Sequence, residues 1–479
     1  MPAVVIVILA TAAMASLPYW LPGLVVRLRM RIFTAINGEE GIEIPGKLVD
    51  ASRMKQVYSD PAANGRSKGA TLSDLFWYWL APGPEVHQEH LEAGERYEEV
   101  ARTTRRILGI PRKTAEETAA QCAVRMLNST SIRNMKLVRI RDLMMPVWAE
   151  FYYELVFGER CPPAARELIV GNAHDVVTAL KCCSLRHMNR RHRLTRFLLE
   201  NIKAGKVPFV LPERLAIEEQ AFYLQGAFFN TAVVQMSEAM VHLCMVIAQH
   251  DEVQVRLTAN LEDDRYLDRV IAETLRLYPL FGISHRITSA DIVLDEGTTI
   301  PQGAVLCFNH SEYHRTGFDH PERFDPERWE NLSPHEQNYI PFGVAANRPC
   351  PASGLAPVTM RAVIREMLRR YAVYSSASHT RSSPNRGPCL IVSRNSSLDT
   401  RLQRTILVYL RVRDRWEDVW RSLVQLVLGT YMVWDARRLR LCANYFEGTA
   451  AHVSSAGAAA VVRSCPITQH DARHAQRGV

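Results

Sequence analysis

Residues 341–357 read PFGVAANRPCPASGLAP, a loop rich in glycine and proline that leads into an apparent helix. Cys350 lies near the middle of this loop, with Gly343 and Arg348 upstream of it. A lone cysteine is most often a small buried apolar side chain. The loop by itself therefore assigns no function to Cys350, and the assignment depends on features elsewhere in the chain.

Two charged segments precede the loop. In ETLRLYP, residues 273–279, Glu273 and Arg276 are spaced to share one helix face, where they can pair. HPERFDPERW, residues 320–329, follows and contains Arg328. Either segment alone is common by chance. Their order, their spacing from Cys350 and the long apolar helix that precedes them are together much harder to obtain by chance.

This ordered set resembles the cytochrome P-450 family, the haem-thiolate monooxygenases, over roughly residues 35–395. The loop of that family reads F-G-x-G-x-R-x-C-x-G, and Phe342, Gly343, Arg348 and Cys350 supply counterparts. The resemblance implies a mainly α (α+β) fold, with a large helical body, a long central helix and small β-sheets. It places haem b between the long helix and the cysteine loop, with Phe342 beside it and the Cys350 thiolate as the iron ligand, which favours O–O cleavage.

The resemblance also implies which side chains hold the haem propionates. Arg348 matches one propionate-binding arginine of the family, and Arg286 in GISHRIT matches the other. A helix expected over residues 96–108 offers Arg102, with Arg105 and Arg106 as alternatives, because the usual tryptophan is missing. For each arginine the alternative is a surface salt bridge.

Glu273, Arg276 and Arg328 resemble the buried Glu-Arg-Arg cluster that fixes the core beneath the haem. Breaking such a cluster by halves is costly because one removed partner strands another. We expect these three residues to act structurally.

The apolar stretch from Glu218 to Val253 predicts a helix through the middle of the domain. The family carries an acid followed by threonine at this helix's centre, for proton delivery. Counting back from AQHDEVQVRL puts that pair at Val234 and Gln235, and a shifted register offers Asn230 and Thr231. Neither pair contains a carboxylic acid. We expect Thr231 and Gln235, with substrate and water, to carry the proton, unless the chemistry needs no relay.

The cysteine loop departs from the family pattern in length and in glycine content. It is one residue longer between Phe342 and Cys350, and Ala346 and Ala352 replace two glycines. Because glycine permits close backbone approach, we expect the loop to be rebuilt locally.

Three functions remain open from these residues. The first is a monooxygenase that inserts one oxygen atom of O2 into a small apolar or natural-product-like molecule. The second is reductant-independent haem-thiolate chemistry, such as peroxide-driven oxidation, rearrangement, dehydration or group transfer from a pre-oxidised substrate, which the missing acid favours. The third is a non-enzymatic haem sensor.

The net charge of +8 points to an acidic partner or an anionic membrane surface. The basic residues show no nucleic-acid-binding signature, and no dinucleotide fingerprint indicates a reductase module. Arg361, Arg365 and Arg369 follow the cysteine loop at helical spacing, so they predict a positive stripe for an acidic ferredoxin or flavoprotein reductase. A solvated helix face is the alternative. We expect a monomer.

Residues 1–30 form a hydrophobic segment that is uncharged from Ala3 to Val26 and is followed by Arg27, Arg29 and Arg31. About 20 apolar residues can cross a bilayer, and the basic flank favours the cytoplasmic side for the rest of the chain. Pro18 and Pro22 weaken a straight span, which leaves an interfacial or packed segment as the alternative. The protein is otherwise expected in the cytoplasm.

The remaining chain predicts a catalytic domain over residues 31–395 and an extension over 396–479. Short β-rich runs over residues 291–310 and 371–394 indicate small sheets. The extension shows a helical stripe formed by Trp416, Val419, Trp420, Leu423 and Val427. The ten cysteines contain no C-x-x-C pair, which favours a reducing compartment.

Overall fold

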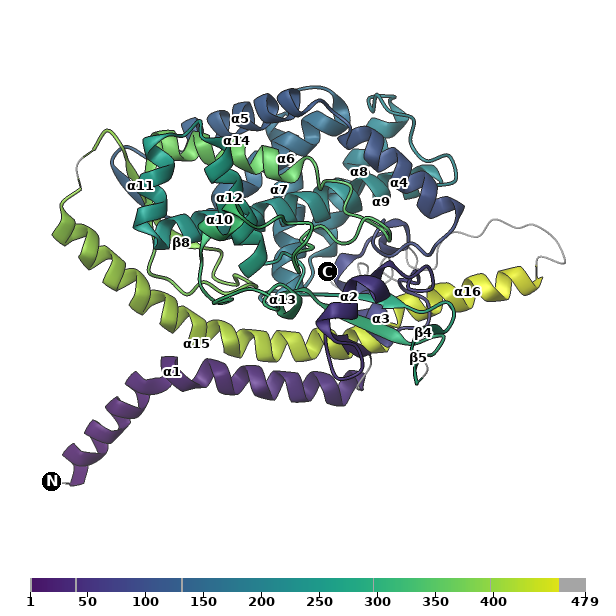
Figure 1. Cartoon of the computed structure of the whole chain (residues 1–479), viewed down its shortest axis with the longest axis horizontal. Helices are drawn as coiled ribbons and strands as arrows, with labels where there is room; N and C mark the ends of the chain where they lie inside the picture. Colours follow the sequence, from purple (N-terminus) through teal and green to yellow (C-terminus); the bar gives the residue numbers. More distant parts are fainter. Residues whose placement is uncertain (1, 39–40, 131, 296, 397, 456–479) are drawn as a thin grey trace, which may run out of the picture.

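The computed structural model describes residues 2–38, 41–130, 132–295, 297–396 and 398–455. The chain forms a large helical body with small sheets at its side (Figure 1), which confirms the predicted mainly α architecture. The helices of the first half are α1 (Pro2–Asn37), α2 (Ala51–Ser59), α3 (Thr71–Leu80), η1 (Pro84–Val86), α4 (Glu95–Leu108), α5 (Arg112–Ser129), α6 (Ile140–Phe157), α7 (Pro163–Leu180) and α8 (Met188–Lys203).

The second half carries the central helix and the elements around the cysteine loop. Its helices are α9 (Ile217–Leu224), η2 (Gln225–Ala232), α10 (Val233–Gln249), α11 (Asp251–Ala259), α12 (Asp264–Leu277), α13 (His310–Tyr313), η3 (Pro326–Glu330), α14 (Ala356–Arg370), α15 (Thr400–Leu439) and α16 (Leu441–Ser455). The cysteine loop lies between η3 and α14, so both ends of the loop are fixed by helices.

The strands are β1 (Ile42–Ile44), β2 (Met135–Arg139), β3 (Ile283–Ile287), β4 (Ile292–Asp295), β5 (Thr298–Ile300), β6 (Val305–Asn309), β7 (Tyr371–Tyr374) and β8 (Pro388–Ser393). Strands β4 to β8 lie within the predicted β-rich runs, whereas β1 and β2 lie early in the chain and β3 lies just before the first run. The sheet orders are β1-β6-β3, β2-β8-β7 and β4-β5. In the first sheet β1 runs parallel to β6, and β3 pairs antiparallel with β6 so that Arg286 stands opposite Leu306.

The long central helix is continuous from α9 through η2 to α10, and η2 is π-helical. The prediction of one helix from Glu218 to Val253 is confirmed apart from its end, because the chain breaks at His250 before α11 begins. The apolar side chains of α10 belong to the main hydrophobic core, together with those of α5, α6 and α14. Phe342 of the cysteine loop packs against the same core.

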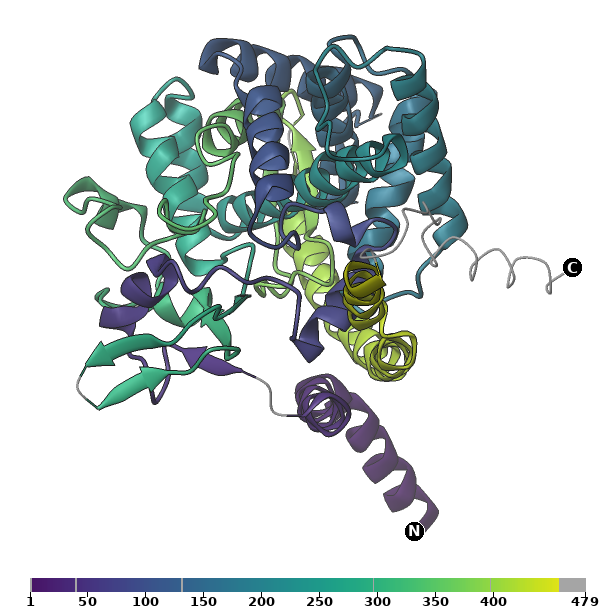
Figure 2. The same ribbon diagram turned by 90° about the vertical axis from the view of Figure 1, so that its right-hand side faces the viewer.

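The N-terminal helix α1 and the C-terminal helix α15 lie side by side along one edge of the body (Figures 1 and 2). Arg415 of α15 donates a hydrogen bond to the hydroxyl of Tyr19, and the ring of Phe33 approaches Gly429. Farther along, Met432 and Val433 of α15 join a small hydrophobic cluster with residues of α1 and α3. The extension after residue 395 therefore packs against both the N-terminal segment and the body.

Within the described residues, two helices are long and apolar enough to cross a membrane. One spans Val4–Asn37, and its most apolar window contains no buried residue. The other, Ile217–Gln249, is 83% buried in that window and is the central core helix. The first part of α1, before Pro18 and Pro22, bends away from the body (Figure 1), as prolines inside a helix favour.

Candidate functional site

The cysteine loop closes on itself and on helix α2. The Cys350 backbone N–H donates to the carbonyl of Phe342 at 3.0 Å, and Val344 forms a bridge with Asn347. The Asn347 side-chain amide donates to the carbonyl of Tyr58 at 2.9 Å. The loop therefore makes a tight turn between Val344 and Asn347.

Two residues of this loop have positive φ angles. Gly343 has φ 76°, and a Cβ atom there would lie 3.2 Å from the Tyr58 hydroxyl, so both conformation and space favour glycine. Arg348 has φ 51°, which few non-glycine residues adopt. Such strain often occurs at functional sites.

The Cys350 side chain is half-buried, and the backbone N–H of Ala352 donates a hydrogen bond to its sulfur. Burial raises the pKa of the Cys350 thiol to about 11, and the Ala352 hydrogen bond opposes that rise. Replacing the family's glycine by Ala352 therefore keeps the backbone donor. Cys465 lies outside the described residues.

Arg348 and Arg286 lie in a buried environment, and each has a guanidinium N–H donor without an acceptor. Arg348 donates to the carbonyl of Leu91 at 2.7 Å, and its guanidinium lies 4.0 Å from the centre of the Tyr97 ring. Arg286 donates to the hydroxyl of Tyr58 at 2.9 Å. The Arg348 Nη2 and Arg286 Nε atoms are buried without a hydrogen-bond partner, and neither arginine pairs with a carboxylate in the described part of the chain.

Arg66 adds a third buried cation to this neighbourhood. Its guanidinium pairs with Glu89 at 2.8 Å and donates to the carbonyl of His285 at 2.8 Å. Burial, followed by the charge of Arg66, lowers the pKa of Arg348 to about 10. A guanidinium whose pKa falls this far lacks compensating negative charge. The cluster therefore has the electrostatics of an anion-binding site.

His90 and Tyr97 belong to this site although sequence reasoning did not select them. Burial, with smaller effects of the surrounding cations, lowers the pKa of His90 well below its ordinary value, so the imidazole is neutral, and its buried Nδ1 has no partner. Tyr97 lies in α4, where the family's missing tryptophan was expected, and covers Arg348. The position of Arg348 in the sequence, two residues before Cys350, does not reveal that Tyr97 and His90 lie near it.

Arg102 does not lie with the buried arginines Arg348 and Arg286. Arg102, Arg105 and Arg106 are all on the exposed face of α4, whereas the buried face carries Val100, Ala101 and Thr104. The structure does not bring Arg102 to the buried arginines, so its predicted role in cofactor binding gains no support.

The structure brings Glu273, Arg276 and Arg328 together. The Glu273 carboxylate accepts from Arg276 Nε at 2.8 Å and from Arg328 Nε at 3.0 Å, and all three side chains are largely buried. The indole of Trp329 donates to the same carboxylate at 2.9 Å. This cluster fixes η3 to α12 directly upstream of the cysteine loop.

The central helix meets a histidine from another part of the chain. His87, just after η1, is buried, and its Nε2 lies 2.6 Å from the Thr231 hydroxyl and 3.1 Å from the carbonyl of Gly226. Its Nδ1 accepts the backbone N–H of Glu89, and burial lowers its pKa, so the neutral ring carries its proton on Nε2. His87 therefore donates to Thr231, whose own proton is left to donate onward.

The other candidates on the central helix have different surroundings. Val234 is buried in the core, and Gln235 is half-buried with no polar contact recorded among the described residues. The side-chain oxygen of Asn230 accepts a hydrogen bond from the amide nitrogen of Asn172 at 2.6 Å. The side-chain oxygen of Asn172 in turn accepts from Gln225 at 3.0 Å. The shifted register with Thr231 is thus the one whose hydroxyl contacts a titratable side chain, that of His87.

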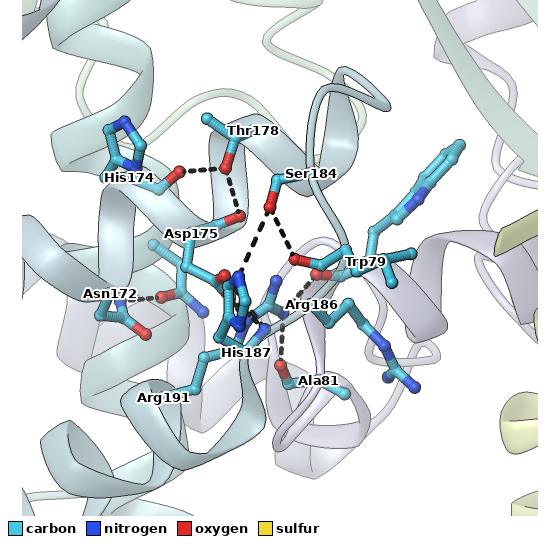
Figure 3. Close-up of polar contacts among 12 residues, drawn as sticks. Trp79, Ala81, Asn172, His174, Asp175, Thr178, Ser184, Arg186, His187 and Arg191 are labelled. Carbon is cyan, nitrogen blue, oxygen red and sulfur yellow. Dashed lines mark hydrogen bonds and ion pairs between the residues drawn. The ribbon is translucent and has the colours of Figure 1, made fainter. Parts of the chain in front are cut away.

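A buried ion pair, drawn in Figure 3, holds the chain at Trp79 and Ala81, which precede η1 and His87. Arg191 of α8 pairs with Asp175 of α7 at 2.5 Å and donates to the carbonyls of Trp79 at 2.5 Å and Ala81 at 2.6 Å. Both charged side chains are fully buried. Arg191 lies on the buried face of α8 and positions the chain between α3 and η1.

The predicted positive stripe on α14 is wrong. Arg361 pairs with Asp268 at 3.0 Å, Arg365 with Glu116 at 3.0 Å, and Arg369 with Glu262 at 2.5 Å. Arg361 and Arg365 are also mostly buried. The acidic residues come from α5, α12 and the turn before α12, which a local sequence pattern does not reveal. The arginines therefore hold helices together.

A cluster of Cys122, Glu150 and Glu154 is the one group in the described residues whose side chains are spaced to hold a metal. Arg125 binds both carboxylates and Arg166 binds Glu150 as well. The carboxylates are thus already neutralised, and the cluster is an ion-pair network between α5, α6 and α7.

The fold and the cysteine loop together define the class of protein. A cytochrome P450 from Thermus thermophilus superposes with a TM-score of 0.55 at 19% identity, over 71% of this chain and 90% of that one. A zebra fish cytochrome P450 bound to progesterone superposes with a TM-score of 0.57 at 16% identity, over 72% and 92%. The chain therefore has the helical fold of the cytochromes P450.

Sequence comparisons give the family. The profile named Cytochrome P450 matches residues 242–399, which contain the Glu273 cluster and Cys350. A (1S)-1-hydroxy-luvungin A synthase from Citrus sinensis is 35% identical over 26% of this chain and 26% of its own length. Ent-kaurenoic acid oxidase 2 from Arabidopsis thaliana is 30% identical over 29% and 27%. Residues 242–399 thus match the cytochrome P450 family.

The matches cover only part of these relatives. A cytochrome P450 monooxygenase from Aspergillus niger is 30% identical over 32% of this chain and 34% of its own length. The aligned parts of the three relatives thus amount to about a quarter to a third of their lengths.

Proposed function

We propose that this protein is a haem-thiolate monooxygenase that inserts one oxygen atom of O2 into a small apolar, natural-product-like molecule. The proposal rests on the match of residues 242–399 to the family and on one structural observation: the cysteine loop that carries Cys350 also carries Arg348, whose buried Nη2 donor lacks an acceptor. Relatives named as a monooxygenase and as an oxidase of ent-kaurenoic acid support the reaction type and the substrate class.

The residues present fit haem b. The Cys350 sulfur would bind the iron, and a bound metal keeps a coordinating thiol deprotonated despite its raised pKa. Arg348 Nη2, Arg286 Nε and His90 Nδ1 are buried donors or acceptors without partners, as a pair of propionates requires. Phe342 would complete the floor beside the cysteine. When bound, a haem with a thiolate ligand supplies the activation of dioxygen.

The chain's own contribution to proton movement centres on Thr231. His87 Nε2–H donates to the Thr231 oxygen, which orients the hydroxyl so that its proton points away from His87. Because His87 is buried and neutral, it fixes the direction of that hydrogen bond. We propose that Thr231 and His87 replace the acid and threonine of other members of the family. Gln235 remains a second candidate that could act through water.

Electrons would come from a separate redox protein. The paired arginines of α14 remove the charge argument for a strongly acidic one, so a ferredoxin and a flavoprotein reductase remain equally compatible. We further propose that α1 attaches the protein to a membrane, with the body on the cytoplasmic side. The apolar window of α1, which contains no buried residue, and the arginines that follow it support this attachment.

Turnover experiments test the proposed reaction. The haem-loaded protein should oxidise a responsive substrate in the presence of O2 and a surrogate reductant, and should incorporate one ¹⁸O atom from labelled dioxygen. Product formation with hydrogen peroxide alone, or from a pre-oxidised substrate without reductant and O2, would instead establish the reductant-independent chemistry.

A further inference from the structure

One face of α15 is apolar and exposed along most of the helix. Eight side chains at spacings of three or four residues share it: Tyr409, Val412, Trp416, Trp420, Leu423, Val427, Tyr431 and Trp434. Trp420 is 70% exposed and Val427 is 66% exposed. Such a continuous apolar stripe on a surface helix indicates a contact with another phase or another molecule.

The exposed charged residues of α15 have one sign. Every exposed charged residue within α15 is an arginine, namely Arg401, Arg404, Arg411, Arg415 and Arg438. The acidic residues of α15 are less exposed and partly neutralised: Asp414 is buried, Asp435 is buried and pairs with Arg438, and Glu417 and Asp418 are half-buried and pair with Arg413 and Arg421. An apolar face rich in tryptophan and flanked by arginine is the pattern of helices that lie in a membrane interface.

The helix that carries this face packs beside the proposed membrane segment. Helix α1 runs beside α15 and contributes further exposed apolar side chains, including Tyr19, Trp20 and Leu24. Helix α1 contains no acidic residue, and its arginines follow the apolar stretch. Figures 1 and 2 show both helices along the same edge of the body.

We propose that α15 binds the surface of an anionic bilayer, with its tryptophan face in the interface and its arginines at the lipid headgroups. The inference extends the proposed attachment through α1 and assigns a role to the C-terminal extension. Two copies of this chain joined through the same face would bring their arginines together, so repulsion opposes that arrangement.

The test keeps the full chain and alters only exposed side chains. In the first variant, Val7→Asp and Leu9→Asp weaken insertion of α1. In the second, Trp420→Gln and Trp434→Gln are added to remove two anchors of α15. The matched control adds Val255→Gln and Val293→Gln, which are exposed apolar residues on α11 and β4. Circular dichroism confirms that each variant is folded.

Binding is measured by co-sedimentation with vesicles of phosphatidylcholine and phosphatidylserine, and with phosphatidylcholine alone. The first variant should still bind the anionic vesicles, and salt should weaken that binding. Adding the α15 substitutions should lower the affinity at least about tenfold, because two interfacial tryptophans are lost. The control substitutions should leave the affinity unchanged. Hydroxyl-radical oxidation of Trp420 and Trp434 in the unmodified protein should fall when anionic vesicles are added.

Several outcomes would overturn the inference. If the first variant no longer binds, α1 alone contacts lipid, and the attachment stands while the role of α15 fails. If the α15 substitutions change neither affinity nor the oxidation pattern, the inference fails as well. If Trp420 and Trp434 are protected without lipid in a particle of twice the monomer mass, a second copy covers the face. If the unmodified protein binds no vesicles, both the attachment and the inference fail.

Discussion

The Nε2 atom of His87 lies 2.6 Å from the hydroxyl oxygen of Thr231, and the two residues join the segment after η1 to the π-helical part of the central helix. A π-helical segment inside a longer helix frequently marks a functional site. The contact places a neutral hydrogen-bond donor behind the one threonine that the central helix offers in its η2 segment.

Thr231→Val and His87→Phe should therefore impair oxygen-dependent turnover. Loss of a positioned proton donor typically costs about 10²-fold or more in rate, and the reducing power should be released as hydrogen peroxide. The measurement compares product formed with reductant consumed. Ser237→Ala is the matched control, since this buried hydroxyl on the same helix bonds only the carbonyl of Val233 among the described residues. Equal coupling in all four proteins would disprove the relay.

Gly226→Ala should displace His87. A Cβ atom at position 226 would lie 2.8 Å from the His87 Cδ2 atom, closer than a packed core tolerates. We expect a loss of about 1–3 kcal/mol in the free energy of unfolding, measured with urea. In a His87→Ala background the same substitution should cost much less, because the clash is gone. An equal cost in both backgrounds would show that the two residues are not in contact.

Glu273→Gln should destabilise the protein strongly. The substitution removes the carboxylate that compensates the buried Arg276 and Arg328, and breaking a buried cluster in this way costs about 3–5 kcal/mol. Haem retention after gel filtration should fall in parallel. Asp295→Asn breaks an exposed pair with Arg53 and should leave both quantities almost unchanged. Haem loss equal to that of Asp295→Asn would show that the cluster does not support the site.

Glu85 should make stability depend on pH. Burial raises its pKa from 4.5 to about 7, and its Oε2 atom has no partner. The folded state thus binds more protons than the unfolded state between these values, so its stability falls as pH rises from about 4.5 to about 7. Glu85→Gln removes this dependence. The stability of the variant relative to the unmodified protein should therefore increase by roughly 3 kcal/mol between about pH 5 and about pH 8. A constant difference would mean that Glu85 titrates normally.

The sequence predicted those features that depend on local patterns. The central helix follows from an apolar run, and the pairing of Glu273 with Arg276 follows from helical spacing. The cysteine loop could be located from its residues and its order in the chain. Each of these inferences needs only neighbours along the chain or a long, unambiguous periodicity.

The remaining features depend on contacts between distant segments. His87 and Thr231 are 144 residues apart, and no motif links them. The arginines of α14 resembled a free positive stripe because their acidic partners lie in other helices. The π-helical register of η2 is equally invisible, since a helix that is apolar nearly all round shows no preferred face.

The absorption spectrum of the reduced, haem-loaded protein with carbon monoxide tests the central claim most directly, because it reports the ligand opposite the bound gas. The unmodified protein should give the long-wavelength Soret band of thiolate-ligated haem. Cys183→Ser, at another half-buried cysteine, should keep this band, and Cys350→Ser should abolish it. A band that persists in Cys350→Ser, or that is missing from the unmodified protein, would contradict the assignment of Cys350 as the iron ligand.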